Sequence, residues 1–151
     1  MESVYNVETE GQLLQLFKMV HNAMVEEFNR KVKNLELTSA QVLVLGCLDQ
    51  AEENELCQKD LEEILNLSNP TITGIVKRLE AKGFIERRSW EKDARYKRIC
   101  LTEKARSIKT EAQDCVSEVW GRFLSCLTPE EVETLTALLH KIQTHQQGNE
   151  S

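Results

Sequence analysis

Basic side chains are concentrated in the middle of the chain, where they could bind a polyanion. The segment from Ser68 to Thr102 contains nine Lys or Arg residues and four acidic residues, a net charge of +5. Because the whole chain carries −6, the remaining residues carry −11. A basic face on an acidic body is typical of nucleic-acid-binding proteins. A charge run can also be an ordinary solvated surface, so the elements that position these side chains must decide between the two interpretations.

Two short helices joined by a tight turn are predicted around the start of this segment. The first helix covers residues 58–65 and would bury Leu61, Ile64 and Leu65, which are spaced as one helical face. The second helix has Ser68 or Asn69 as its N-cap and Pro70 near its first position, where a missing N–H costs nothing. Its buried stripe would consist of Ile72, Ile75, Val76 and Leu79.

The opposite face of the second helix has small residues at its start and basic residues further along. A helix that enters the major groove of DNA has this character, because small residues allow close approach and cations meet the phosphates. The candidate DNA-binding residues of this helix and its cap are Ser68, Asn69, Pro70, Thr71, Thr73, Gly74, Lys77 and Arg78.

A charged β-hairpin is predicted directly after this helix. Gly83 stands where a left-handed C-cap is needed, and residues 84–90 and 96–101 then read as two short strands. The polar residues 91–95 form the tip between them. The candidate DNA-binding residues of the hairpin are Arg87, Lys92, Asp93, Arg95 and Lys97. A helix-turn-helix followed by such a hairpin predicts a winged helix-turn-helix that binds double-stranded DNA.

The residues of these elements resemble the DNA-binding core of the MarR family of transcriptional regulators. The resemblance covers about residues 38–106 and is carried by Leu61, Thr71-Ile72-Thr73, Val76, Arg78-Leu79-Glu80, Gly83-Phe84-Ile85, Arg87, Asp93-x-Arg95 and Ile99-x-Leu101-Thr102. It implies a homodimeric repressor that responds to a small-molecule effector and binds a pseudo-palindromic operator. It also implies that Asp93 orients Arg95 and that Arg95 meets DNA. Ala105 stands where the family often has glycine, and a helix tolerates alanine better.

The rest of the chain is expected to be helical, so that the fold class is mainly α with a small β-hairpin wing. We expect one domain over residues 1–151, with the winged helix-turn-helix at about 38–102 and dimerisation helices at about 9–34 and 103–146. Capping boxes begin helices after Thr38 and Thr128, and one helix is expected to run from Thr102 to Leu127. The terminal helices carry more apolar surface than one chain can bury, which predicts a second subunit.

Two other functions fit parts of the same pattern. A winged helix can bind a protein in place of DNA, and a reactive cysteine could make the protein a thiol-based redox sensor. Cys57 is expected at the opening of a helix, where the helix N-terminus lowers a thiol pKa. The favoured interpretation is nevertheless that the cysteines are inert apolar residues, because a buried free cysteine usually behaves as a small apolar side chain. The acidic stretch 49–63 is interpreted as a solvated face turned away from DNA, with the binding of a basic partner as the alternative.

No enzyme, cofactor or metal is expected. The sequence contains no Gly-rich phosphate loop and no nucleophile elbow. His140 and His145 are five residues apart, which does not match the helical spacing of a metal-binding pair. The chain has no apolar stretch as long as a membrane span and no signal-peptide pattern at its start, so we expect a cytoplasmic protein that does not enter a membrane.

Overall fold

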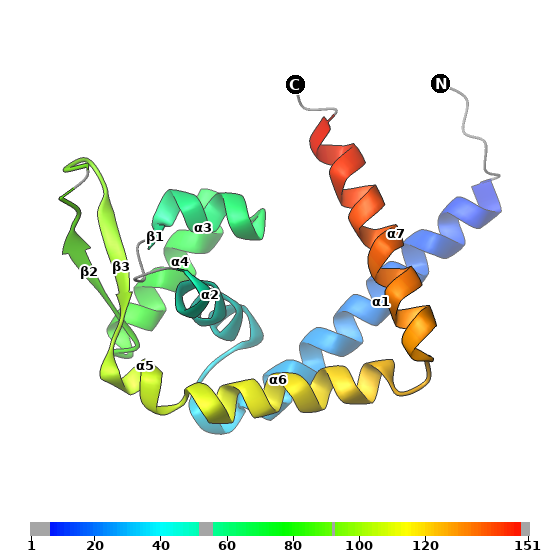
Figure 1. The fold of residues 1–151 in the computed structure, drawn as a ribbon, viewed down its shortest axis with the longest axis horizontal. Helices are drawn as coiled ribbons and strands as arrows, with labels where there is room; N and C mark the ends of the chain where they lie inside the picture. Colours follow the sequence, from blue (N-terminus) through cyan, green and yellow to red (C-terminus); the bar gives the residue numbers. More distant parts are fainter. Residues whose placement is uncertain (1–6, 52–55, 92, 149–151) are drawn as a thin grey trace. The chain divides into compact units, whose positions relative to one another are not determined.

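The computed structural model describes residues 7–51, 56–91 and 93–148 (Figure 1). The chain forms two compact units, residues 1–116 and 117–151. The elements are α1 (Val7–Val32), the 3₁₀ helix η1 (Lys33–Leu35), α2 (Ser39–Gln50), β1 (Leu56–Cys57), α3 (Gln58–Leu65), α4 (Asn69–Ala81), β2 (Ile85–Ser89), β3 (Lys97–Leu101), α5 (Glu103–Ser107), α6 (Lys109–Leu124) and α7 (Pro129–Gly148). The predicted class, mainly helical with a small hairpin, is confirmed.

The core of the first unit lies where α2, α3 and α4 meet the sheet. Its fully buried side chains include Leu48, Leu61, Ile72, Leu79, Phe84 and Ile99. The predicted stripe of α4 is confirmed, since all four of its members are buried. The prediction for α3 is wrong at Ile64, which is 57% exposed. Leu61 makes the central contact of α3, and Ile64 lies about 60° further around the helix, beyond the side that packs on α4, β1 and β3.

The strands form one antiparallel sheet in the order β1-β3-β2. The hairpin register runs from Ile85 opposite Leu101 to Ser89 opposite Lys97, which confirms the predicted pair of strands. Strand β1 adds Leu56 opposite Ile99 on the other edge of β3. This strand was not predicted, because two residues are too few to show an alternating pattern.

The ends of α4 are anchored by local and distant hydrogen bonds. Gly83 has φ 76° and forms the predicted left-handed cap. In this cap the N–H of Phe84 donates to the Leu79 carbonyl at 3.0 Å. The Lys82 ammonium donates to the Glu36 carbonyl and to Oε1 of the buried Gln41. These bonds connect the C-terminal end of α4 to the segment before α2 and to the first turn of α2.

The predicted helix from Thr102 to Leu127 is interrupted at Ile108 and ends at Leu124. In a continuous helix the N–H of Ile108 would donate to the Lys104 carbonyl. The Ser107 hydroxyl donates to the Lys104 carbonyl at 2.7 Å, and the Ile108 N–H donates to the Arg106 carbonyl. Side-chain hydroxyls compete with the helical hydrogen bonds in this way, which explains the division into α5 and α6.

Apolar side chains are exposed along the terminal helices. On α1 the exposed ones are Leu13, Leu14, Leu16, Phe17, Met19 and Val20, and in the second unit they are Trp120, Leu135, Leu138, Leu139 and Ile142. The capping box at the start of α7 is confirmed, because the Thr128 N–H donates to Glu131 at 2.8 Å and the Glu131 N–H donates to Thr128 at 3.3 Å. No helix within the described ranges is long and apolar enough to cross a membrane.

Candidate nucleic-acid interface

Helix α4 presents one exposed face opposite its buried stripe. Ser68 takes the N-cap conformation, with φ −66° and ψ 152°, and its carbonyl accepts from the N–H of Ile72 at 3.0 Å. Of the predicted DNA-binding residues, Thr73 and Gly74 are half-buried, and Ser68, Asn69, Pro70, Thr71, Lys77 and Arg78 are exposed. The side chains of Lys77 and Arg78 make no ion pair within the described part of the chain. The face therefore offers polar groups at its start and two cations near its middle.

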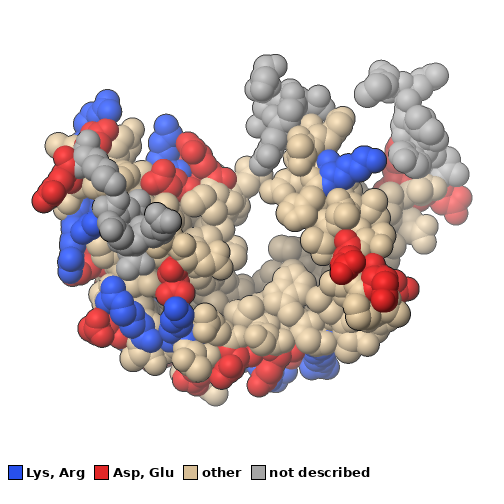
Figure 2. Space-filling view, viewed as in Figure 1, with Lys and Arg blue, Asp and Glu red and all other residues tan. Residues whose placement is uncertain are grey.

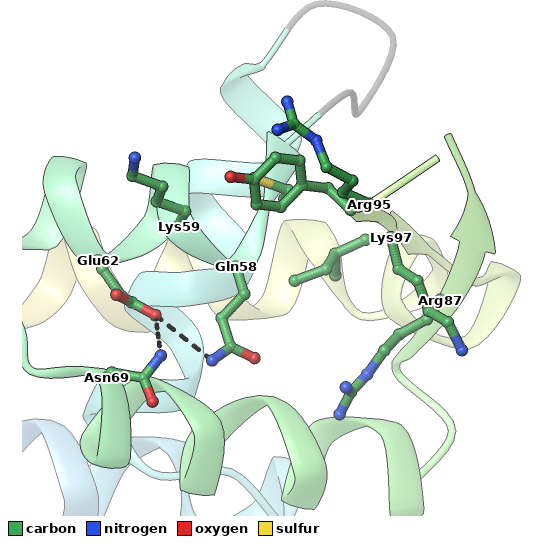
Figure 3. Close-up of a pocket in the computed structure, with 10 residues that line it drawn as sticks. Gln58, Lys59, Glu62, Asn69, Arg87, Arg95 and Lys97 are labelled. Carbon is green, nitrogen blue, oxygen red and sulfur yellow. Dashed lines mark hydrogen bonds between the residues drawn. The ribbon is translucent and has the colours of Figure 1, made fainter. Parts of the chain in front are cut away.

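Two polar residues of α4 are held by α3. The Asn69 amide donates through Nδ2 to Glu62 Oε1 at 2.6 Å, and Gln58 Nε2 donates to Thr73 Oγ1 at 2.8 Å (Figure 3). Gln58 Nε2 also lies 3.4 Å from the same Glu62 oxygen. Sequence reasoning missed Gln58 and Glu62. The interpretation of residues 49–63 as a solvated face turned away from DNA stays a prediction, and within that stretch Glu62 contacts the start of α4. The spacing of four residues between Gln58 and Glu62 already placed them on one side of α3.

A groove of about 460 Å³ lies between α3, the start of α4 and the wing. Figure 3 shows its lining, which contains the basic residues Lys59, Arg87, Arg95 and Lys97 and the single acid Glu62. The other lining residues are Cys57, Gln58, Asn69, Tyr96 and Ile99. The fold thus brings predicted site residues of α4 and of the wing to one concave, mostly basic surface.

The tip of the wing is organised by Asp93. Its carboxylate accepts from the backbone N–H of Arg95 at 3.0 Å and from the Arg95 guanidinium at 3.0 and 2.7 Å. These hydrogen bonds lower the pKa of Asp93 and raise that of Arg95. The predicted pairing of the two residues is confirmed, while 82% of the Arg95 side chain stays exposed. Lys92 lies outside the described residues.

The other predicted wing residues differ in exposure and in the ion pairs that they form. Arg87 is 27% exposed and forms an ion pair with Glu80 of α4 at 3.2 Å, so it also ties the wing to that helix. Lys97 is exposed. Figure 2 shows basic and acidic side chains side by side over the wing on the face in view. Within β2, Arg88 forms an ion pair with Glu86. Part of the positive charge of the wing is therefore neutralised locally.

The five cysteines differ in their surroundings. All five are thiols, and Cys57 and Cys100 are buried. Burial raises the pKa of Cys57, and the Asp60 carboxylate beside it acts in the same direction. The prediction that the helix N-terminus would lower this pKa is wrong, because removal from water and the Asp60 carboxylate outweigh the backbone hydrogen bonds of Lys59 and Asp60, which lower it. Burial also raises the pKa of Cys47. Among the described residues, no three His, Cys, Asp or Glu side chains are placed to hold a metal ion.

Comparison with known proteins connects this geometry to one family. The MarR family model matches residues 37–97, which span α2 to the start of β3. The S. aureus protein MepR in complex with DNA is 27% identical, with a TM-score of 0.80 over 87% of this chain and 96% of MepR. A cysteine-to-serine mutant of MarR from E. coli, complexed with operator DNA, is 26% identical, with a TM-score of 0.81 over 91% of this chain and 99% of that one.

A transcription regulator MarR from Oenococcus oeni extends the agreement to a third organism. It is 29% identical, and the match covers 87% of this chain and 98% of that protein with a TM-score of 0.74. The matches thus include the terminal helices as well as the winged segment. The family match, the fold and the paired Asp93 and Arg95 at the wing tip agree, and the chain is similar in its winged segment and in its fold to the MarR family of transcriptional regulators.

Proposed function

We propose that this protein is a sequence-specific, double-stranded DNA-binding repressor that acts as a homodimer. Helix α4 enters the major groove, and the wing carries Arg95 to the adjacent minor groove. The observation that carries the proposal is the exposed face of α4, with Asn69, Lys77 and Arg78, beside a wing tip whose arginine is oriented by Asp93. MepR and E. coli MarR, which share the fold, have been solved with DNA, and that supports the same partner here.

The homodimer is supported by the apolar side chains exposed on α1 and α7. In water such surfaces are unfavourable, and a second copy of the chain would cover them. We propose a single MarR-type domain in which about residues 9–34 and 103–146 form the dimer and about residues 38–102 bind DNA. A two-fold dimer then requires a pseudo-palindromic operator, because each half-site meets one copy of α4.

A repressor of this kind leaves the operator when a ligand binds more tightly to a second conformation of the dimer. In that conformation the two α4 helices no longer match the spacing of the major grooves. The proposed effector is a small molecule, and DNA binding itself requires no catalytic residue, cofactor or metal. The protein would act in the cytoplasm, where the operator DNA is accessible.

A binding experiment with two salt concentrations tests the proposal. Selection from a randomised duplex library should recover a pseudo-palindrome, and fluorescence anisotropy should then show affinity for it that falls steeply as salt rises. Each neutralised phosphate contributes about −0.9 to the slope of log K against log salt. A protein-interaction winged helix would select no sequence and would show no such slope, and this result would contradict the proposal.

A further inference from the structure

The polar start of α4 is connected to a single carboxylate of α3. Glu62 Oε1 accepts from Asn69 and lies next to Gln58, which in turn donates to Thr73 (Figure 3). We propose that Glu62 sets the hydrogen-bonding polarity of the face that reads DNA, so that Asn69 is oriented to read adenine and Thr73 acts as a donor. The inference rests on the proposed insertion of α4 into the major groove and names the base edges that it reads.

The orientation of Asn69 follows from the chemistry of its partner. A carboxylate only accepts hydrogen bonds, so the group 2.6 Å from Glu62 Oε1 must be the NH₂ of the amide. Figure 3 shows the Asn69 oxygen pointing away from Glu62. One N–H is occupied, and the carbonyl oxygen and the second N–H remain available. This pair complements N6 and N7 of adenine, whereas guanine places an acceptor, O6, against the amide oxygen.

Glu62 also determines the role of the Thr73 hydroxyl, through Gln58. Gln58 Nε2 lies 3.4 Å from Glu62 Oε1 and 2.8 Å from Thr73 Oγ1, so the Thr73 hydroxyl accepts from this amide. In α7 the hydroxyls of Thr134 and Thr136 donate to the carbonyls four residues earlier. Within the described residues the Thr73 hydroxyl donates to no such carbonyl, so its proton is available to the groove, where N7 or O6 of guanine, N7 of adenine and O4 of thymine accept. Cytosine offers only a donor on this edge.

The spacing of the two residues predicts the spacing of the bases. Asn69 and Thr73 are four residues apart on one side of α4, a rise of about 6 Å along the helix. With base pairs separated by about 3.4 Å, the two contacts fall about two base pairs apart. Each half-site should therefore contain an adenine about two positions from a base with a major-groove acceptor.

The test compares base preferences in wild type and in Glu62→Gln. The half-site selected from a randomised duplex library is substituted one base pair at a time, and the affinity of each duplex is measured by fluorescence anisotropy. A direct base contact discriminates by about fivefold or more, and we expect this preference for adenine over guanine at one position in the wild type. Glutamine can donate as well as accept, so Glu62→Gln should reduce the preference there to below about twofold.

Glu63→Gln is the matched control. Glu63 follows Glu62 on α3, its side chain is 69% exposed, and its ion-pair contact with Lys59 is long at 4.0 Å. Both variants lose one negative charge, so both should bind all duplexes somewhat more tightly, but only Glu62→Gln should change the ranking. Asn69→Ala should remove the same preference as Glu62→Gln, and the double variant should show no further loss, because the two residues act as one unit. Thermal melting establishes that each variant is folded.

The possible results separate the two proposals. If Glu62→Gln keeps the wild-type ranking and resembles Glu63→Gln, the role of Glu62 is overturned while DNA binding stands. Retention of the ranking by Asn69→Ala would overturn it in the same way. If the wild type selects no sequence and binds duplexes without a salt slope, the proposed function fails and this inference fails with it.

Discussion

At the scale of single residues, the wing tip makes the most direct prediction. Arg95 is held by Asp93 but remains largely exposed, so its guanidinium can reach the negative potential of a narrow minor groove. We expect Arg95→Ala to weaken binding to all sequences by similar factors and to reduce the salt slope by about one ion. Arg30→Ala is the control, because Arg30 forms a similar pair with Glu27 on α1. An unchanged salt slope in Arg95→Ala would show that the wing does not contact DNA.

The direction in which Asp93→Ala changes the DNA affinity should show what this carboxylate does. A carboxylate that only repelled phosphates would raise the affinity when removed, whereas one that orients Arg95 would lower it, and we expect a lower affinity with an unchanged melting temperature. The pKa of Asp93 is lowered from its ordinary value of 3.8, so the pair is lost only as the pH falls through that lowered pKa. The affinity ratio of wild type to Arg95→Ala should therefore stay constant between about pH 8 and about pH 5.

The cysteines make a second prediction at this scale. Because burial raises the pKa of Cys57 and Cys47, little of either thiol is thiolate at neutral pH. In a titration of the native protein with a thiol-specific disulfide reagent, the exposed Cys126 should react first, and Cys126→Ser should lack this fast phase. DNA affinity should be the same before and after the fast phase. Rapid modification of Cys57 with loss of binding would support the redox-sensor alternative.

At the scale of elements, the substitution Gly74→Ala in α4 should increase the stability of the protein and decrease its affinity for the operator. Apart from the neighbouring residues and the backbone of α4 itself, a Cβ at this position would meet no described atom within 4 Å, so the fold does not require glycine there. Gly74→Ala should stabilise the protein by up to about 1 kcal/mol through helix propensity and raise the melting temperature. It should nevertheless weaken operator binding, because the added methyl group lies on the face that approaches the bases.

Gly46→Ala provides the comparison on α2. A Cβ at Gly46 also has no neighbour within 4 Å, so this variant should gain similar stability in a thermal melt. Its operator affinity should match the wild type. Equal affinity of Gly74→Ala and Gly46→Ala would mean that α4 uses a different face toward DNA.

At the scale of the whole molecule, the prediction concerns symmetry. Light scattering should give about twice the chain mass of 17.4 kDa, and the operator should contain two half-sites about 10 base pairs apart. Leu138→Glu combined with Leu139→Glu puts charges on apolar side chains that are 53% and 44% exposed in the single chain. We expect this variant to be monomeric and to lose affinity for the full operator, whereas Gln143→Glu, at an exposed polar position of the same helix, should remain dimeric.

The sequence by itself determined the features that depend on neighbouring residues. The capping boxes at Thr38 and Thr128, the left-handed turn at Gly83 and the buried stripe of α4 are confirmed, because each follows from residues within one or two helical turns. Ser68 takes the predicted N-cap position, although its side chain makes no capping hydrogen bond. The pairing of Asp93 with Arg95 belongs to the same class, although it was expected from the family resemblance. The wing was also recognisable, since its two strands alternate and are joined by a short polar tip.

Only the tertiary structure decided the features that depend on residues distant in sequence. Burial raised the pKa of Cys57 against the effect of the helix N-terminus, and the contacts of α3 left Ile64 exposed. The bonds from Gln58 to Thr73 and from Lys82 to Gln41 join residues 15 and 41 positions apart. Patterns within single elements carry no information about such pairs, because the contacts arise only when helices pack. For this reason the sequence was enough to predict the face of α4 that we propose reads DNA, and the fold was needed to show which side chains hold that face in place.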